Sequence, residues 1–199
     1  IKESNIHHLR LGFYTGNLFT EKPNPERDVK PILEQFRAIK PTVISLAFDP
    51  EGSGPDTHYK VLQAIAQAVR EWGKETDISN VKIWGYRNVW YKFHPAEATH
   101  IVPVSLNAMG VFSNAFENCY LSQVDASFPS HKFDGKFSDY AKKIWVNQLA
   151  YTGNLLGKPY FYQNESPRLR TTHGLLFFKE MTAEEFLQSA LKLEKSIGG

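Results

Sequence analysis

The hydrophobic residues of this chain follow two patterns. Short runs rich in branched and aromatic residues predict strands at 6–13, 42–48, 81–86, 99–104 and 173–178. Between these runs, apolar side chains recur every three or four residues and predict helices near 29–39, 61–72, 105–120, 138–156 and from 182 onward. Strands that alternate with helices favour an α/β fold, a Rossmann-like three-layer sandwich with a mainly parallel sheet.

One strand and the loop after it attract most interest. Residues 42–48 form an almost continuous apolar run, which is typical of a strand covered on both faces. In sheets of this kind, ligands bind beyond the carboxyl ends of the strands. The loop at 49–58 is therefore the first place to look for a site. In the helix before this strand, Asp28 is the predicted N-cap and Pro31 is expected in the first turn.

Composition and charge limit the function classes. The chain has 199 residues, of which 42% are hydrophobic, enough for one packed domain spanning 1–199. Lys and Arg number 23 and Asp and Glu 21, so the net charge of +2 argues against nucleic acid as a partner. No apolar run approaches the roughly 20 residues that span a bilayer, which argues against a membrane partner. Cys119 is the single cysteine, so no internal disulfide forms. We expect a cytoplasmic protein and a buried, inert thiol.

The loop at 49–58 concentrates chemistry-bearing side chains. Asp49, Glu51, Asp56 and His58 place three carboxylates and an imidazole within ten residues, beside glycines that allow close backbone approach. The alternative is structural, with Asp56 or Thr57 capping the next helix and Gly-Pro making the turn. A phosphate-binding loop is disfavoured because the motif's lysine is missing and the carboxylates repel phosphate.

A second cluster follows the strand at 81–86. Trp84, Tyr86 and Trp90 surround Arg87 in sequence. Aromatic faces stack on sugars, and a guanidinium binds phosphate or carboxylate through two hydrogen bonds. For Trp84 and Tyr86 we favour a core position. For Arg87 and Trp90 two interpretations stay open: substrate binding at the rim of the site, or covering the edge of the core.

Four segments together resemble the LmbE/PIG-L family of zinc-dependent N-acetylglucosamine deacetylases. The likeness is strongest to the deacetylase-like domain fused behind a glucosamine-6-phosphate deaminase (isomerase) domain in some bacteria. It covers about residues 1–156, in segments 49–61, 84–90, 102–105 and 122–129. The resemblance implies that His58 is a zinc ligand and that the neighbouring Asp56 is the catalytic carboxylate. In the family, a metal-bound water attacks the amide carbon of an N-acetyl sugar.

The chain departs from that family in two ways. The family's His-Pro-Asp-Asp run, which supplies two zinc ligands and the general base, is missing, and His94-Pro95-Ala96-Glu97 lies in the wrong place to replace it. Tyr120 also stands where related proteins often have His. We therefore expect the C-terminal part of a longer amino-sugar-metabolism protein, within a hydrolase acting on C–N bonds. The isolated chain is expected to be inactive and to hold no zinc, and the expected ligand is an amino sugar or a sugar phosphate. The alternatives are a non-catalytic sugar-binding or phosphosugar-binding module, or an oligomerisation module that forms a homo-oligomer.

Overall fold

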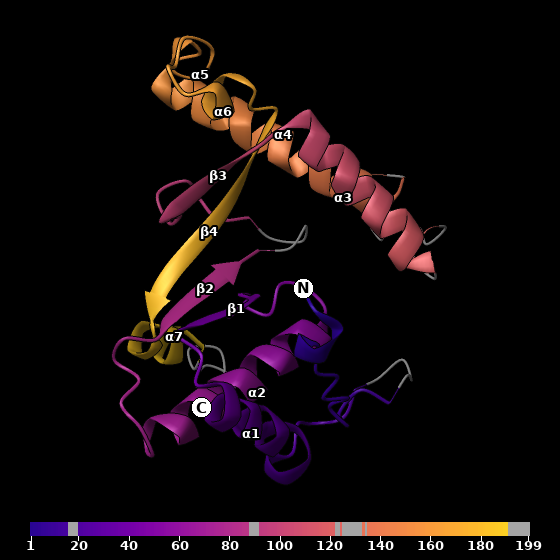
Figure 1. Ribbon diagram of the computed structural model, residues 1–199, viewed down its shortest axis with the longest axis vertical. Helices are drawn as coiled ribbons and strands as arrows, with labels where there is room; N and C mark the ends of the chain where they lie inside the picture. The colour runs from indigo at the N-terminus through magenta and orange to yellow at the C-terminus, as the bar shows by residue number, and fades with distance from the viewer. Residues whose placement is uncertain (16–19, 88–91, 122–123, 125–132, 134, 191–199) are drawn as a thin grey trace. The chain divides into compact units, whose positions relative to one another are not determined.

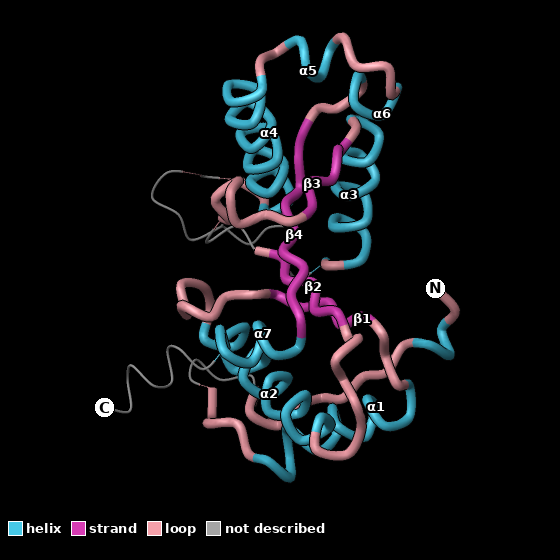
Figure 2. Tube along the Cα trace, turned by 90° about the vertical axis from the view of Figure 1, so that its left-hand side faces the viewer, coloured by secondary structure: helices cyan, strands magenta, loops and turns pink. Residues whose placement is uncertain are grey.

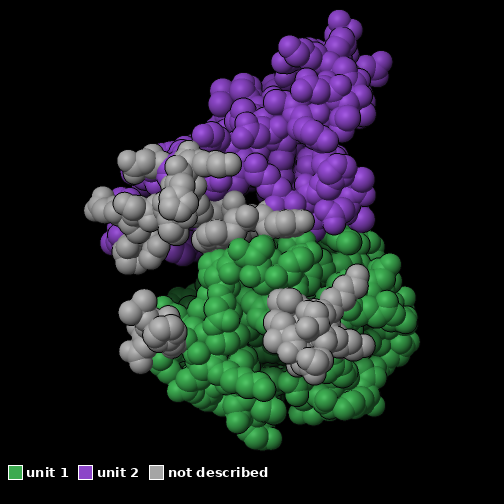
Figure 3. Space-filling view, turned by 180° about the vertical axis from the view of Figure 1, so that it is seen from behind, with its two compact units in different colours: residues 1–91, 179–199 green, residues 92–178 purple. Residues whose placement is uncertain are grey.

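The chain divides into two compact units. The computed structural model describes residues 1–15, 20–87, 92–121, 124, 133 and 135–190. Unit 1 comprises Ile1–Tyr91 and Lys179–Gly199, and unit 2 comprises Lys92–Phe178 (Figure 3). Whether both units make up the single deacetylase-like domain expected from the sequence stays a prediction.

Unit 1 contains a parallel strand pair with helices packed on it. Its elements are η1 (Glu3–Asn5), η2 (Pro25–Val29), α1 (Lys30–Ile39), β1 (Val43–Ala47), α2 (Asp56–Gly73), β2 (Lys82–Tyr86) and α7 (Ala183–Ala190) (Figure 1). In the β1–β2 pair, Val43 lies opposite Lys82 and Ala47 opposite Tyr86. Helix α2 packs against both α1 and α7. Its own inward face, from Leu62 to Trp72, forms the centre of this core.

The strand pair of unit 1 is buried on one face only. Ile44, Leu46 and Ile83 are buried, whereas Val43 is 41% exposed and Trp84 39% exposed. The expectation that residues 42–48 are covered on both faces is therefore wrong for the described residues. So is the expected core position of Trp84, whose indole N–H donates to the Glu180 carboxylate at 2.8 Å. A branched, apolar strand composition does not by itself reveal whether the second face is covered.

Unit 2 pairs two antiparallel strands with helices. Its elements are β3 (His100–Val104), α3 (Leu106–Cys119), α4 (Phe137–Leu156), α5 (Pro159–Tyr162), α6 (Pro167–Arg170) and β4 (Gly174–Thr182), whose last residues belong to unit 1 (Figure 2). His100 lies opposite Phe178 and Val104 opposite Gly174. A Cβ atom at Gly174 would meet Met109 of α3 and Trp145 of α4, so the strand start passes close to both helices.

The sheet order is β1-β2-β4-β3, with β1 and β2 parallel and β3 and β4 antiparallel. The α/β class is confirmed, but the sheet is mixed, and the prediction of a mainly parallel sheet is wrong. The physical reason is that an alternating or apolar pattern identifies a strand and its faces, whereas strand direction depends on its partner. The three-layer arrangement is also not met in the described part of unit 1, because one face of β1 and β2 lacks a helical layer.

Several local expectations have clear outcomes. The helices predicted from residues 105 and 182 begin at caps: Ser105 caps α3 by accepting from the Ala108 amide, and Thr182 and Glu185 cap α7 reciprocally. The expected strand at 6–13 is wrong, because no strand is found among those residues. Cys119 is exposed, not buried. Within the described part of the chain, no helix combines the length and apolarity needed to cross a membrane.

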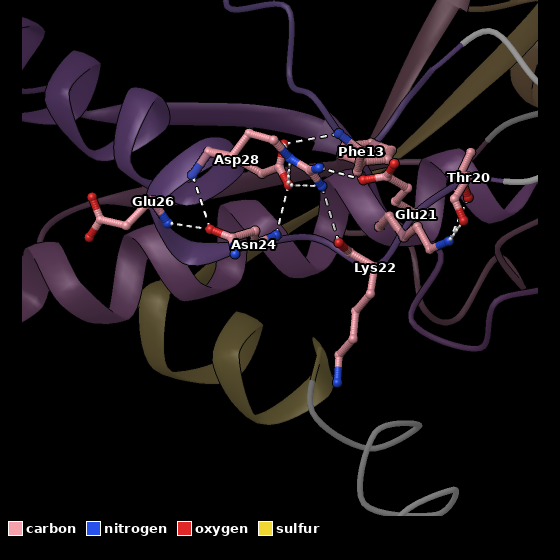
Figure 4. A network of polar contacts seen from close by, with 9 residues as sticks. Phe13, Thr20, Glu21, Lys22, Asn24, Glu26 and Asp28 are labelled. Atoms are coloured by element: carbon pink, nitrogen blue, oxygen red, sulfur yellow. Dashed lines mark hydrogen bonds and ion pairs between the residues drawn. The ribbon is translucent and has the colours of Figure 1, made fainter.

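Asp28 does not cap α1, contrary to expectation. Asn24 accepts hydrogen bonds from the Glu26 and Arg27 amides at the start of η2, while the Asp28 side chain is completely buried. The Asp28 carboxylate accepts from the amides of Phe13 and Asn24 and from the Arg27 guanidinium (Figure 4). It thereby ties the chain around Phe13 to η2, which immediately precedes α1.

Candidate functional site

The loop between β1 and α2 lies at the carboxyl end of β1, as predicted. β1 ends at Ala47, and α2 begins at Asp56, which places His58 in the first turn of that helix. The Phe48 amide donates to the Tyr86 carbonyl at 2.8 Å, so the chain leaves β1 beside the end of β2. Gly52 has a φ of 62°, a left-handed conformation that favours glycine and lets the loop turn sharply. The loop and the end of β2 therefore share one edge of the parallel pair.

Asp49 organises this loop from within. Its carboxylate accepts from the Ser53 amide at 3.1 Å, the Ser53 hydroxyl at 2.6 Å and the Gly54 amide at 2.6 Å. A short acidic side chain that accepts from backbone donors a few residues later is a common way to close a loop. Asp49 is only 13% exposed, and its oxygens are directed at these donors. Its first role is therefore to hold the loop's shape.

Arg87 follows β2 directly and reaches this loop. Its guanidinium lies 3.3 Å from an Asp49 oxygen and 2.7 Å from a Glu51 oxygen, and its second terminal nitrogen donates to Glu51 at 3.2 Å. The guanidinium carbon also lies 5.5 Å from the centre of the Phe48 ring. Arg87 thus reaches the loop that carries His58, as expected where the ends of adjacent parallel strands meet at one edge. That Arg87 and Trp90 both approach one cleft with His58 stays a prediction.

His58 is partly buried beside Asp49. Burial lowers the pKa of His58 below its ordinary value, and the negative charge of Asp49 offsets part of this effect. The neutral imidazole is therefore favoured at pH 7. A neutral imidazole can accept a hydrogen bond or ligate a metal through one nitrogen, and it donates through the other.

Asp56, the first residue of α2, forms an ion pair and a hydrogen bond. Its carboxylate lies 2.6 Å from the Lys60 ammonium, and it accepts a hydrogen bond from the Thr20 hydroxyl. The hydrogen bonds from Lys60 and Thr20 lower the pKa of Asp56. A carboxylate with a lowered pKa is a weak base at neutral pH. The capping alternative also fails, because α2 has Pro55 at its N-cap and no side-chain cap.

The aromatic candidates contribute less to this site. Trp90 falls outside the described residues, so its predicted substrate-binding role stays a prediction. Tyr86 is partly buried, and burial raises the pKa of its hydroxyl. In unit 2, the His94 amide donates to the Glu97 carboxylate at 2.9 Å, so Glu97 closes a turn there.

The donor set around His58 does not fit a catalytic zinc site by itself. Such a site needs three protein ligands, and no group of three His, Cys, Asp or Glu side chains suited to a metal occurs in the described part of the chain. The carboxylates nearest in sequence are paired: Asp49 and Glu51 with Arg87, and Asp56 with Lys60. The roles of His58 as zinc ligand and Asp56 as catalytic group stay predictions.

Three further residues contribute to this site, and they differ in how easily the sequence predicts their contacts. Lys60 stands four residues after Asp56, a helical spacing at which opposite charges meet, so this partner was readable. Ser53 stands four residues after Asp49 in a glycine-containing loop, a spacing at which an Asp side chain can accept hydrogen bonds that close the loop. Thr20 lies 36 residues before Asp56, and no local pattern links them.

Comparison with known proteins gives one distant likeness. Over 106 residues the chain is 31% identical to a glucosamine-6-phosphate deaminase-like protein of Bacteroides thetaiotaomicron. The match covers 50% of this chain and spans 15% of the length of that curated relative. No family model matches the chain, and no solved structure matches it.

Proposed function

We propose that this chain belongs to an amino-sugar-metabolism protein of glucosamine-6-phosphate deaminase type, and that its loop at 49–58 binds an amino sugar or a sugar phosphate. The arrangement that carries this proposal is the edge where His58, Asp49 and Arg87 gather. It places a neutral imidazole, carboxylates and a guanidinium beside one another. Such groups suit a ligand with hydroxyl, amino and charged substituents. The likeness to a protein named as glucosamine-6-phosphate deaminase-like supports the amino-sugar assignment.

Binding to the full 199-residue chain tests this proposal. Isothermal titration with glucosamine, N-acetylglucosamine and glucosamine 6-phosphate should detect binding of at least one, and His58→Ala should weaken it. His173→Ala is the matched control, because His173 is an exposed imidazole in unit 2. If none of the three sugars binds, or if both variants bind like the unmodified chain, the proposal is wrong.

The finer proposal is that His58 serves a zinc-dependent deacetylase that hydrolyses an N-acetyl amide. This role requires two more ligands and a general base from residues outside those described, because the local carboxylates are paired. A longer protein that carries a His-Pro-Asp-Asp run should contain zinc and release acetate from an N-acetylglucosamine substrate. His58→Ala should remove most of the zinc. Equal zinc content with and without His58 would refute the ligand assignment.

A second candidate function is self-association through unit 2. The described part of this unit exposes more large hydrophobic side chains than it buries, and several lie along α4 and α5: Val146, Tyr151, Leu155, Leu156, Tyr160 and Tyr162. Residues 144–157 contain no charged side chain, so two copies can meet along this stretch of α4 without like-charge repulsion. The partner that we propose is therefore a second copy of the chain.

Light scattering at rising protein concentration tests self-association. We expect a dimer that Leu155→Glu converts to a monomer, because burying an unpaired carboxylate in the interface is costly. Ile39→Glu is the matched control, since Ile39 is 58% exposed in unit 1 and Leu155 is 62% exposed in unit 2. A monomer at all concentrations, or equal dissociation by both variants, would exclude this role for α4 and α5.

A further inference from the structure

The Arg87 guanidinium lies between two carboxylates that differ in how firmly they are held. The Arg87 side chain is 6% exposed, so an outside ligand can reach it only where a neighbouring group gives way. Both neighbours come from the loop between β1 and α2: Asp49 at 3.3 Å and Glu51 at 2.7 Å. A ligand can contact Arg87 only if one of these two carboxylates leaves the guanidinium.

Asp49 is fixed and Glu51 is not. Asp49 is 13% exposed and accepts three further hydrogen bonds from Ser53 and Gly54. Moving it would break the hydrogen bonds that hold the loop's shape. Glu51 is 52% exposed, and among the described residues it pairs with Arg87 alone. Water reaches the Glu51 carboxylate and can solvate it once it is released, whereas Asp49 is largely shielded from water. Glu51 can therefore leave Arg87 while Asp49 stays.

Glu51 uses the same geometry as an anionic ligand would. Two Glu51 oxygens meet two terminal nitrogens of Arg87, at 2.7 and 3.2 Å. A phosphate group presents two oxygens to a guanidinium in the same two-pronged manner. The Glu51 carboxylate thus stands where a phosphate oxygen pair would bind.

We propose that Glu51 is an internal competitor for an anion subsite on Arg87, and that this subsite takes the phosphate group of a phosphorylated sugar. The inference rests on the proposed amino-sugar function and names its substrate class. Asp49 keeps the guanidinium in place when Glu51 is displaced, so the subsite does not have to be built on binding. A sugar without an anionic group cannot replace the Glu51 carboxylate on Arg87, so it gains no binding energy from this subsite. The subsite therefore favours phosphorylated sugars.

Titration of the full chain with three probes tests the exchange: glucosamine 6-phosphate, glucosamine and inorganic phosphate. Glu51→Gln removes the competing charge, and glucosamine 6-phosphate should then bind about twofold to fivefold more tightly, the upper part of the range expected for loss of one charge pair with an exposed partner. Glucosamine should bind with unchanged affinity. Arg87→Lys keeps the charge but loses the two-pronged geometry, so it should weaken glucosamine 6-phosphate binding by about tenfold or more.

Glu75→Gln is the matched control. Glu75 forms a similar two-pronged pair with Arg37 in the same unit, just past the opposite end of α2 from the loop, and it is 42% exposed. This variant should leave the affinity unchanged. Equal affinity of Glu51→Gln and unmodified chain for glucosamine 6-phosphate would overturn the exchange, as would an equal gain in Glu75→Gln. If glucosamine still binds in either case, the amino-sugar proposal stands without the phosphate subsite. If no probe binds to any variant, both proposals are wrong.

Discussion

Replacement of the buried Asp28 by Asn tests how the N-terminal part of unit 1 is held together. Each Asp28 oxygen accepts from a different backbone amide: one from Phe13 at 3.1 Å and the other from Asn24 at 2.7 Å. An Asn amide has one oxygen and one NH₂ group. Whichever way it is turned, its NH₂ group faces one of these two N–H donors, and that donor loses its partner. Asp28→Asn therefore keeps the shape of the side chain but breaks the pattern of acceptors.

The expected loss of stability is about 2–4 kcal/mol. An unsatisfied buried donor costs about 1–3 kcal/mol, and weakening a charge-assisted hydrogen bond adds to it. The contribution of Arg27 is discounted, because its side chain is 38% exposed and also pairs with Glu21. Urea denaturation followed by circular dichroism measures the change. Glu26→Gln, at a carboxylate that is 82% exposed, should match the unmodified chain within error.

The pH dependence of the same measurement checks the charge. Burial alone raises the pKa of Asp28, but hydrogen bonds from Arg27, Asn24 and Phe13 outweigh it and leave the pKa below its ordinary value. A lowered pKa means that the contribution of Asp28 is present above its unfolded pKa of about 3.9 and disappears as the pH falls through the folded value. The difference between Asp28→Asn and the unmodified chain should therefore shrink below about pH 4. A difference under 0.5 kcal/mol at pH 7, on the order of the error of such fits, would refute this reasoning.

Three further changes test the packing. Gly85→Ala should destabilise the chain by about 1–3 kcal/mol, because a Cβ atom there would meet the Phe48 Cβ at 2.7 Å. Gly110→Ala should stabilise it by about 0.5–1 kcal/mol, because a Cβ atom at this helical position meets only open space. Equal urea midpoints for the two variants would contradict this. Thr182→Ala should cost about 1 kcal/mol in the same assay through loss of the α7 cap, and no change would mean that the cap contributes nothing. Cys119 should react fully with a thiol reagent in the folded chain, and protection until unfolding would contradict its exposure.

The sequence was sufficient to predict most elements but not how strands pair. Helical spacing located α2 and α4, and the capping residues Ser105 and Thr182 located the starts of α3 and α7. These features depend on neighbours within a few residues, which is why they are readable. The antiparallel pairing of β3 with β4 joins residues 70 to 78 positions apart, from Val104 with Gly174 to His100 with Phe178. Nothing in either strand's own pattern specifies that direction.

The candidate site shows the same division. The position of the loop, and of His58 in the first turn of α2, followed from the order of a strand, glycines and a helix. The state of its carboxylates did not. Asp49, Glu51 and Asp56 look alike in sequence as possible bases or ligands, yet each is paired with a cation. Pairing depends on which basic side chain the fold brings within reach, and Arg87 lies 38 residues beyond Asp49.

This pairing changes what the cluster can do. Three unpaired carboxylates beside an imidazole would attract a divalent cation, and their negative charges would repel phosphate. With Arg87 between Asp49 and Glu51, and with Lys60 against Asp56, two positive charges offset three negative ones in the same region. A phosphate that displaces Glu51 adds its own negative charge to the region, and the released Glu51 carboxylate, which is 52% exposed, then has to be solvated by water. A local sequence count of acidic residues therefore points to a metal, whereas in the fold each of these carboxylates already has a cationic partner.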